Sequence, residues 1–157
     1  QETYPGWGFM LANGATTVWE RWEHLTGGSM NSHNHPMMGS ASSWFAKYLG
    51  GIRVDPQAPA FRRIAIQPYP VAGLDWVRSE YRSMYGPIRS AWRREGGRFT
   101  LRVTVPVNTS AAVYLPKGTA VEGGKPAAQA EGVRFLREEA GASVYEVGSG
   151  DYEFVIE

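Results

Sequence analysis

Apolar positions in the first third of the chain recur at the spacing of a helix. From Met37 to Leu49 they fall three and four residues apart, which predicts an amphipathic helix. Pro36 suits the first helical position, because its missing N–H would have no partner there. Asn34 or His35 is expected as the cap before it, and the two glycines after Leu49 as its end.

A shorter helix is expected near the beginning of the chain. Pro5 can open it, and the apolar residues within 7–11 supply its bulk. Asn13 and Gly14 follow, and either residue tolerates the left-handed conformation that ends many helices. A loop over residues 24–32, rich in glycine, serine and asparagine, leads to the second helix.

β-branched and aromatic residues between the two helices favour an extended segment over residues 15–22. Successive side chains of an extended chain point to opposite sides, so Val18, Glu20 and Trp22 would share one face. The Glu20 carboxyl group would then lie between bulky apolar neighbours.

After Ile52 the helical period disappears and short alternating runs take its place. Residues 99–105 show the alternation most clearly, and Gly96-Gly97 predicts a hairpin turn before them. Regularly spaced short strands without a helical period predict an antiparallel β-sandwich. The expected strands are 61–68, 74–82, 87–94, 98–105, 109–115, 119–122, 133–138, 142–147 and 151–156. The change of pattern predicts two domains, 1–52 and 53–157.

Composition excludes several classes of protein. The 157 residues have 16 basic and 15 acidic side chains, so no charge excess points to nucleic acid or to an anionic membrane surface. No apolar run is long enough to span a membrane, and the absence of cysteine excludes disulfide and thiolate chemistry. The first five residues lack the features of a signal peptide, so the chain is expected to begin inside a longer protein. The compartment is left open.

Glu20 is the acidic residue with the clearest candidate chemistry. A carboxyl group partly shielded from water by Val18, Trp19 and Trp22 has the environment of a general acid or base in glycoside hydrolysis. The alternative is an ordinary surface ion pair with a nearby arginine. The tryptophan cluster is likewise open to two interpretations, core packing or stacking on a sugar ring.

The three histidines do not form a metal motif. His33 and His35 are two residues apart, and neither they nor His24 show a zinc-ligand spacing. A neutral His35 at a helix start could hydrogen-bond a sugar hydroxyl or serve only as a cap. The glycine doublets match no phosphate loop, and no nucleophile elbow is present. No cofactor and no metal is expected.

Several motifs together resemble the C-terminal part of the bacterial α-L-rhamnosidase family. The resemblance extends over residues 5–116 and is most specific in the Thr-Thr-x-Trp-Glu-x-Trp motif at 16–22 and the Asn-x-x-Asn-His motif at 31–35. The other matching segments are Gly6–Met10, Gly39-Ser40 with Trp44, Tyr48–Ile52, Pro59–Pro68, Tyr85–Ile88 with Trp92, Phe99–Pro106, Asn108-Thr109 and Tyr114–Pro116.

This resemblance implies a fold and a reaction. Residues 1–52 would be the final helices of an (α/α)6 catalytic barrel, and residues 53–157 a C-terminal β-sandwich that covers the barrel through residues such as Trp76, Tyr81 and Trp92. The family removes terminal α-linked L-rhamnose with inversion. Inversion requires a general acid and a general base, separated widely enough to hold the attacking water.

The resemblance also assigns roles to four residues. The glutamate of the family's Trp-Glu-x-Trp motif, which is the general base, falls on Glu20. His35 is expected to hydrogen-bond rhamnose, and Trp19 and Trp22 to wall the site. The family's acid-rich motif, with the general acid, matches nothing in this chain. We therefore expect these residues to be inactive without the rest of the barrel, which is their expected partner together with a rhamnose-containing glycoside.

Two other functions remain open from the sequence. The chain could be a non-catalytic β-sandwich module, which binds carbohydrate through exposed aromatic residues or is purely structural. It could also belong to another (α/α)6 hydrolase or lyase, although the motif around Glu20 favours the rhamnosidase. The enzyme hypothesis places the polar, aromatic concavity around Glu20 and His35, whereas the binding-module hypothesis places it on the sandwich.

Overall fold

A computed structural model describes residues 2–27, 31–139 and 141–157. The chain divides into two compact units, Gln1–Trp44 and Phe45–Glu157. In the described ranges no helix is long and apolar enough to cross a membrane. Residues 28–30 of the predicted loop over 24–32 lie outside the described residues. The predicted boundary after residue 52 stays a prediction.

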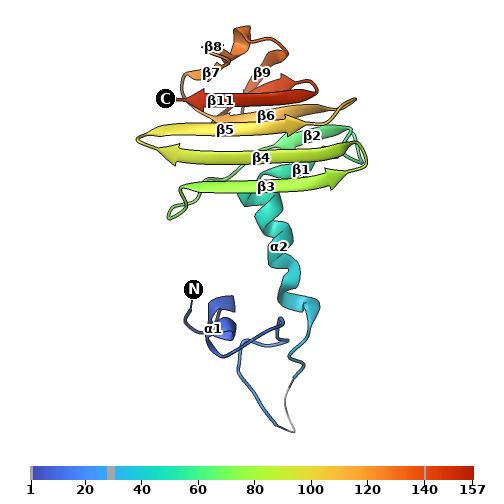
Figure 1. The fold of residues 1–157 in the computed structure, drawn as a ribbon, viewed down its shortest axis with the longest axis vertical. Coiled ribbons are helices and arrows are strands. Elements are labelled where there is room, and N and C mark those ends of the chain that lie inside the picture. Colours follow the sequence, from blue (N-terminus) through green and yellow to red (C-terminus); the bar gives the residue numbers. More distant parts are fainter. Residues whose placement is uncertain (1, 28–30, 140) are drawn as a thin grey trace. The chain divides into compact units, whose positions relative to one another are not determined.

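The first unit contains the predicted short helix, α1, at Trp7–Ala12 (Figure 1). It begins after Gly6, so Pro5 precedes the helix instead of opening it. The predicted end is confirmed: Asn13 caps the last turn, and its backbone N–H donates to Phe9 and Met10. Gly14 follows with φ +80°, the left-handed conformation expected there.

The predicted second helix begins where the sequence indicates. A 3₁₀ turn, η1, covers Pro36–Ser40 with Pro36 at its first position, and α2 follows at Ala41–Trp44. His35 is the cap: its ring accepts a hydrogen bond from the backbone N–H of Met37. The helical residues of the second unit, η2, are Phe45–Leu49 and form a π-helical turn.

Residues 15–22 do not form the predicted extended strand. Their backbone is irregular and is joined to residues 32–35 by isolated hydrogen bonds. The N–H of Glu20 donates to Ser32 O at 2.9 Å, and the N–H of His35 donates to Val18 O at 2.7 Å. Residues 15–22 therefore favour a strand by their composition but have no continuous partner strand with which to form a β-ladder.

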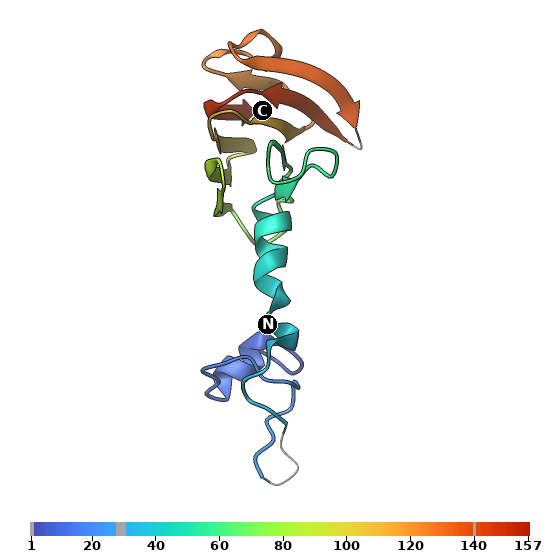
Figure 2. The ribbon, with the colours of Figure 1, turned by 90° about the vertical axis from the view of Figure 1, so that its right-hand side faces the viewer.

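The second unit consists of two sheets, shown in Figure 1 and, turned by 90°, in Figure 2. One sheet has the order β1-β2-β6-β10-β9 and the other β3-β4-β5-β11-β7-β8. The strands are β1 (Ile52–Val54), β2 (Arg63–Ile66), β3 (Trp76–Ser83), β4 (Gly86–Glu95), β5 (Arg98–Val105), β6 (Ser110–Pro116), β7 (Ala120–Glu122), β8 (Lys125–Pro126), β9 (Val133–Glu139), β10 (Ala142–Val147) and β11 (Gly150–Ile156), with a short 3₁₀ turn, η3, at Ala127–Gln129.

This arrangement confirms the predicted sandwich of two sheets and the predicted strands. Gly96 and Gly97 make the hairpin turn between β4 and β5, both with positive φ. One strand pair departs from the expected antiparallel pattern: β2 runs parallel to β6, with Ile64 beside Ala111. Two strands were not predicted, β1 and β8, because each has only two or three residues and no visible alternation.

Alternate residues of both sheets point inward and form one core. The large residues of this core with almost no exposed surface are Ile64, Ile66, Ile88, Trp92, Leu101, Val113, Leu115, Val147 and Phe154. Burial of such side chains is the main stabilising contribution to a β-sandwich. Trp92, expected to cover the barrel, belongs to this core, and its indole N–H donates to Leu49 O at 2.7 Å.

Trp76 and Tyr81, the other two residues expected to cover the barrel, are largely exposed. The Tyr81 ring lies 4.5 Å from the Phe61 ring, whereas Trp76 is 61% exposed at the start of β3. β3 lies at the edge of its sheet. The contact of these two residues with a barrel stays a prediction.

Gly51 fixes the close contact between η2 and the first sheet. Its φ is +74°, and a Cβ atom there would lie 2.2 Å from the backbone nitrogen of Pro68. Both the backbone conformation and the space therefore require glycine at this position.

Candidate active site

Glu20 is held by the polypeptide backbone on the opposite side of the loop. Its own N–H donates to Ser32 O, and the N–H of Ser32 donates to its carboxylate oxygen Oε2 at 2.9 Å. The hydrogen bond from the backbone N–H fixes one of the two carboxylate oxygens. Within the described residues Oε1 has no hydrogen-bond partner. The side chain is half-buried.

The sequence around Ser32 explains why its N–H points to Glu20. The Ser32 hydroxyl donates to Asn34 O at 3.0 Å and accepts from the N–H of Asn34 at 3.1 Å, which closes a tight local turn. The backbone amide of Ser32 is then free to serve the carboxylate. Ser32 was not predicted as a site residue, because it acts through its backbone N–H and not through its side chain.

Backbone hydrogen bonds join the segment that contains His35 to the segment that contains Glu20. The N–H of His35 binds Val18 O, two residues before Glu20, and its side chain is half-buried. The ring nitrogen Nδ1 accepts from the N–H of Met37 at 3.2 Å. An accepting Nδ1 carries no proton, so a neutral His35 has its proton on Nε2. That N–H is the donor available to a hydroxyl group.

Trp19 is buried, with 3% of its surface exposed. The rings of His24 and His33 stack on it at 4.9 Å and 4.8 Å, with interplanar angles of 17° and 23°. The two imidazoles are 6.0 Å apart, so both lie on the same side of the indole. Trp19 therefore supports the loop, and the histidine stacking had no counterpart in the sequence analysis.

Trp22 retains part of its surface and is positioned by Trp7. The two indole rings meet edge to face at 5.4 Å and 78°. The indole N–H of Trp7 donates to Met38 O at 3.2 Å, which ties the pair to η1. Among the four expected site residues, Glu20, His35 and Trp22 each keep surface for a ligand, and Trp19 is covered.

Two buried polar atoms of the same loop have no hydrogen-bond partner within the described residues: Asn31 Nδ2 and His33 Nε2. Buried polar groups in proteins are nearly always satisfied. The Thr17 hydroxyl, by contrast, donates to His33 O and helps to hold the loop. No group of side chains suited to a metal ion occurs among the described residues.

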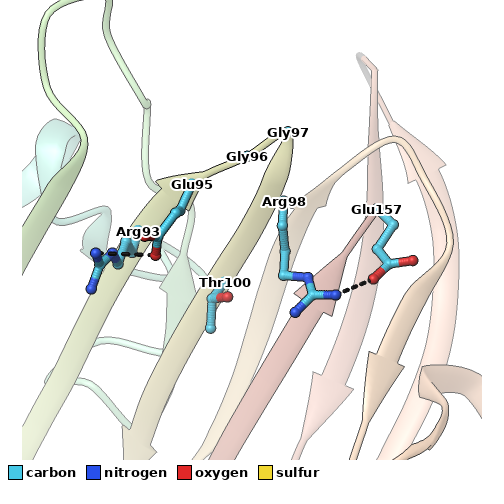
Figure 3. A pocket seen from close by; sticks show the side chains of 7 residues that line it. All are labelled: Arg93, Glu95, Gly96, Gly97, Arg98, Thr100 and Glu157. Carbon is cyan, nitrogen blue, oxygen red and sulfur yellow. Dashed lines mark hydrogen bonds and ion pairs between the residues drawn. The ribbon is translucent and has the colours of Figure 1, made fainter.

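A separate hollow lies beside the β4–β5 hairpin of the second unit (Figure 3). Its charged side chains are paired with each other: Arg93 with Glu95 at 3.0 Å, and Arg98 with Glu157 at 2.6 Å. These pairs are largely exposed, and each charged side chain of the hollow has a partner of opposite sign.

Comparison with family models matches both parts of the chain. Residues 51–129 match the bacterial α-L-rhamnosidase C-terminal domain, and residues 1–49 match the bacterial α-L-rhamnosidase 6-hairpin glycosidase domain. The chain is 35% identical to an α-L-rhamnosidase of Streptomyces avermitilis over 99% of its length, and 38% identical to one of Alteromonas sp. over 74%. It spans only 15% and 13% of those two proteins.

Solved structures agree with this result. An α-L-rhamnosidase from Dictyoglumus thermophilum matches the whole chain with a TM-score of 0.89 and 37% identity, and the chain covers 18% of it. The S. avermitilis α-L-rhamnosidase complexed with L-rhamnose matches with a TM-score of 0.86 and 32% identity. The fold and the motifs thus define a piece of a glycoside hydrolase. The chain belongs to the bacterial α-L-rhamnosidase family.

Proposed function

We propose that the chain is the C-terminal part of an enzyme that removes terminal α-L-rhamnose by inverting acid–base hydrolysis. Residues 1–52 form the last segments of its (α/α)6 barrel and residues 53–157 its C-terminal β-sandwich. The match of residues 1–49 to a 6-hairpin glycosidase domain supports the barrel, and the rhamnose named for the S. avermitilis structure supports the substrate.

The single observation that carries the proposal is the way in which Glu20 is held. Ser32 fixes Oε2 through its N–H and leaves Oε1 without a partner among the described residues. A general base needs this arrangement, with one oxygen anchored and the other able to take a proton from water. In an inverting enzyme that water attacks the sugar carbon opposite the leaving oxygen, which the general acid protonates.

The other three residues bind or support the substrate. Nε2–H of His35 donates to a rhamnose hydroxyl, because Nδ1 is occupied by Met37. Trp22 offers its half-exposed indole as a wall for the sugar, since aromatic rings stack on the C–H faces of pyranoses. Trp19 forms the base beneath this wall, packed against His24 and His33.

The chain alone is proposed to be inactive. Nothing in it matches the family's acid-rich motif, and one carboxylate cannot run both proton transfers. The first unit also exposes large apolar side chains, among them Trp7, Leu11 and Met37 at 45%, 69% and 62%. Surface of this kind fits contact with the remaining helices of the barrel.

The test is hydrolysis of p-nitrophenyl α-L-rhamnoside by the full-length parent. Glu20→Gln should lower kcat on the order of 10³-fold, because it removes a proton acceptor but keeps the shape. Glu23→Gln is the matched control: Glu23 is exposed three residues away, and its removal should change kcat less than about twofold. Undiminished turnover by Glu20→Gln would exclude Glu20 as the base.

Two further measurements test the finer claims. Proton NMR of the first product should show β-L-rhamnose, the inverted anomer, before mutarotation. The purified 157-residue chain should release no p-nitrophenol. Hydrolysis by this chain, or an α-anomer as the first product, would refute the corresponding claim.

A further inference from the structure

The outer face of the six-stranded sheet has a hollow whose base is a small residue between two arginines. Ala91 of β4 is paired with Arg78 of β3 on one side and with Arg102 of β5 on the other. Side chains in register on neighbouring strands lie side by side. The methyl group of Ala91 therefore leaves a gap between two long cationic side chains.

An exposed tryptophan closes one side of this hollow. Trp76 precedes Arg78 by two residues on β3, so both side chains are on the same face of the strand. The Arg78 guanidinium carbon lies 5.8 Å from the centre of the Trp76 ring. The hollow measures about 390 Å³, and its lining includes Trp76, Arg78, Ala91, Arg93, Arg102 and Glu153.

The hollow is cationic, and one of its cations is not neutralised. Its lining contains three arginines and one glutamate. Arg102 is paired with Glu153, and Arg93 with Glu95 just outside the hollow. Arg78 is in no ion pair with another described residue; its guanidinium faces the Trp76 ring instead.

We infer that this hollow binds one carboxylate-bearing sugar unit, such as a uronic acid residue of a glycan. The indole of Trp76, 61% exposed, offers a flat surface for the C–H face of a pyranose. The fork-shaped guanidinium of Arg78 suits a carboxylate, which it can bind with two parallel hydrogen bonds. The volume lies in the range of small-ligand sites.

An acidic saccharide fits these residues better than a nucleic acid does. A phosphate backbone is bound by a stripe of several free cations, whereas here two of the three arginines are already paired. One free guanidinium beside one flat aromatic ring matches a ligand with a single charge and a single ring. This inference does not depend on Glu20 or on rhamnoside hydrolysis. It requires the Trp76 ring to be accessible in the full-length protein, so it is the alternative to the barrel contact expected for Trp76 from the sequence.

Isothermal titration calorimetry of the full-length parent with α-1,4-linked trigalacturonate tests the inference. Trp76→Ala and Arg78→Gln should each raise Kd at least about tenfold, since each removes one of the two contacts. Arg82→Gln is the matched control. Arg82 lies on the same strand, is 89% exposed and pairs with Glu80 outside the hollow; its loss should change Kd less than about twofold.

Two other ligands separate specific binding from general attraction. The methyl ester of trigalacturonate keeps the sugar rings but loses the charges, and it should bind at least about tenfold more weakly than the acid. Equal affinity for ester and acid, equal weakening by Arg82→Gln and Arg78→Gln, or no detectable binding of the acid would each overturn the inference. Tighter binding of a short oligothymidylate would assign the hollow to nucleic acid and overturn it as well.

Failure of this inference can be distinguished from failure of the proposed function. Both variants should hydrolyse p-nitrophenyl α-L-rhamnoside at the parent rate, which also shows that they are folded. Glu20→Gln should bind trigalacturonate like the parent. A loss of hydrolysis in Arg78→Gln would instead place this hollow in the catalytic machinery and contradict its assignment as a separate site.

Discussion

Glu20 and Ser32 exchange two hydrogen bonds, one between their backbones and one from the Ser32 N–H to the Glu20 carboxylate. The pair therefore fixes both the position of Glu20 along the loop and the orientation of its side chain. If Glu20 is the general base, as proposed, a side chain held in this way needs no reorganisation when it accepts a proton.

Loss of the Ser32 backbone N–H should slow catalysis even though the proposed base, Glu20, is still present. Ser32→Pro deletes the donor, and a hydrogen bond to a charged group contributes about 1.5–3 kcal/mol. We expect kcat of the full-length parent on p-nitrophenyl α-L-rhamnoside to fall about 10- to 100-fold. Ser32→Ala keeps the N–H and loses only the bonds of the hydroxyl to Asn34, so its kcat should fall less than about threefold. Equal losses in the two variants would argue against the role of the N–H.

His35 combines a capping function with the proposed sugar contact, and two substitutions separate them. His35→Asn would still offer an acceptor to the Met37 N–H, because asparagine is a good N-cap residue. This variant should therefore keep the urea midpoint of the parent but raise KM for the rhamnoside at least about tenfold. His35→Ala should raise KM similarly and also destabilise the helix by about 1 kcal/mol. An unchanged KM in both variants would limit His35 to the cap.

Trp92 should be the tryptophan on which the stability of the sandwich depends most. Trp92→Phe removes the donor to Leu49 O and leaves a smaller ring in the core, and together these effects should cost about 2–4 kcal/mol. Trp76→Phe is the same substitution at a residue that is 61% exposed, and it should lower the free energy of unfolding by less than about 0.5 kcal/mol. Urea unfolding of the 157-residue chain measures both.

Tyr145 should make the sandwich sensitive to alkali. Burial raises the pKa of the Tyr145 hydroxyl, and the nearby Glu138 carboxylate raises this pKa further. The unfolded chain loses the proton near pH 10, its ordinary value, while the folded chain keeps it. The contribution of the protonated Tyr145 hydroxyl to the free energy of unfolding is therefore complete below about pH 10. It is lost as the pH rises toward the pKa of the folded state, by up to about 1.4 kcal/mol per pH unit.

Comparison with Tyr145→Phe isolates this effect from the other tyrosines. Phenylalanine keeps the ring between Phe135 and Phe154, at 5.6 Å and 6.2 Å from each, and has no proton to lose. Between about pH 9 and about pH 11 the free energy of unfolding should fall less in this variant than in the parent. Parallel pH profiles would show that Tyr145 ionises equally in both states.

The sequence predicted those parts of the structure that depend on local patterns. Alternation located nine strands, and the helix cap at His35 and the stop at Asn13 follow from conformations that few residue types tolerate. The parallel pairing of β2 with β6 was missed because it joins segments more than forty residues apart, and nothing local distinguishes it from an antiparallel pair.

The candidate site was predicted in part, for a similar reason. Glu20 and His35 were selected because their motifs resemble those of a family, and their roles stay predictions; the structure joins their segments through two backbone hydrogen bonds. The extended conformation of residues 15–22 was wrong, since strand propensity without a partner strand gives no ladder. The covering of Trp19 by His24 and His33 depends on how the loop folds back, which no periodicity describes.

The position of β11 has a consequence for the synthesis of the protein. Gly150–Ile156 follows all the other strands in the chain, yet it lies between β5 and β7 in the interior of its sheet. On a ribosome, β3, β4 and β5 can pair as they emerge, and β7 can pair with β8, but the two groups join only when β11 enters between them. A polypeptide that stopped before residue 150 would have two separate half-sheets with exposed edges, a substrate for proteases and chaperones. Closure of the sandwich therefore depends on this strand, because β11 joins β5 to β7.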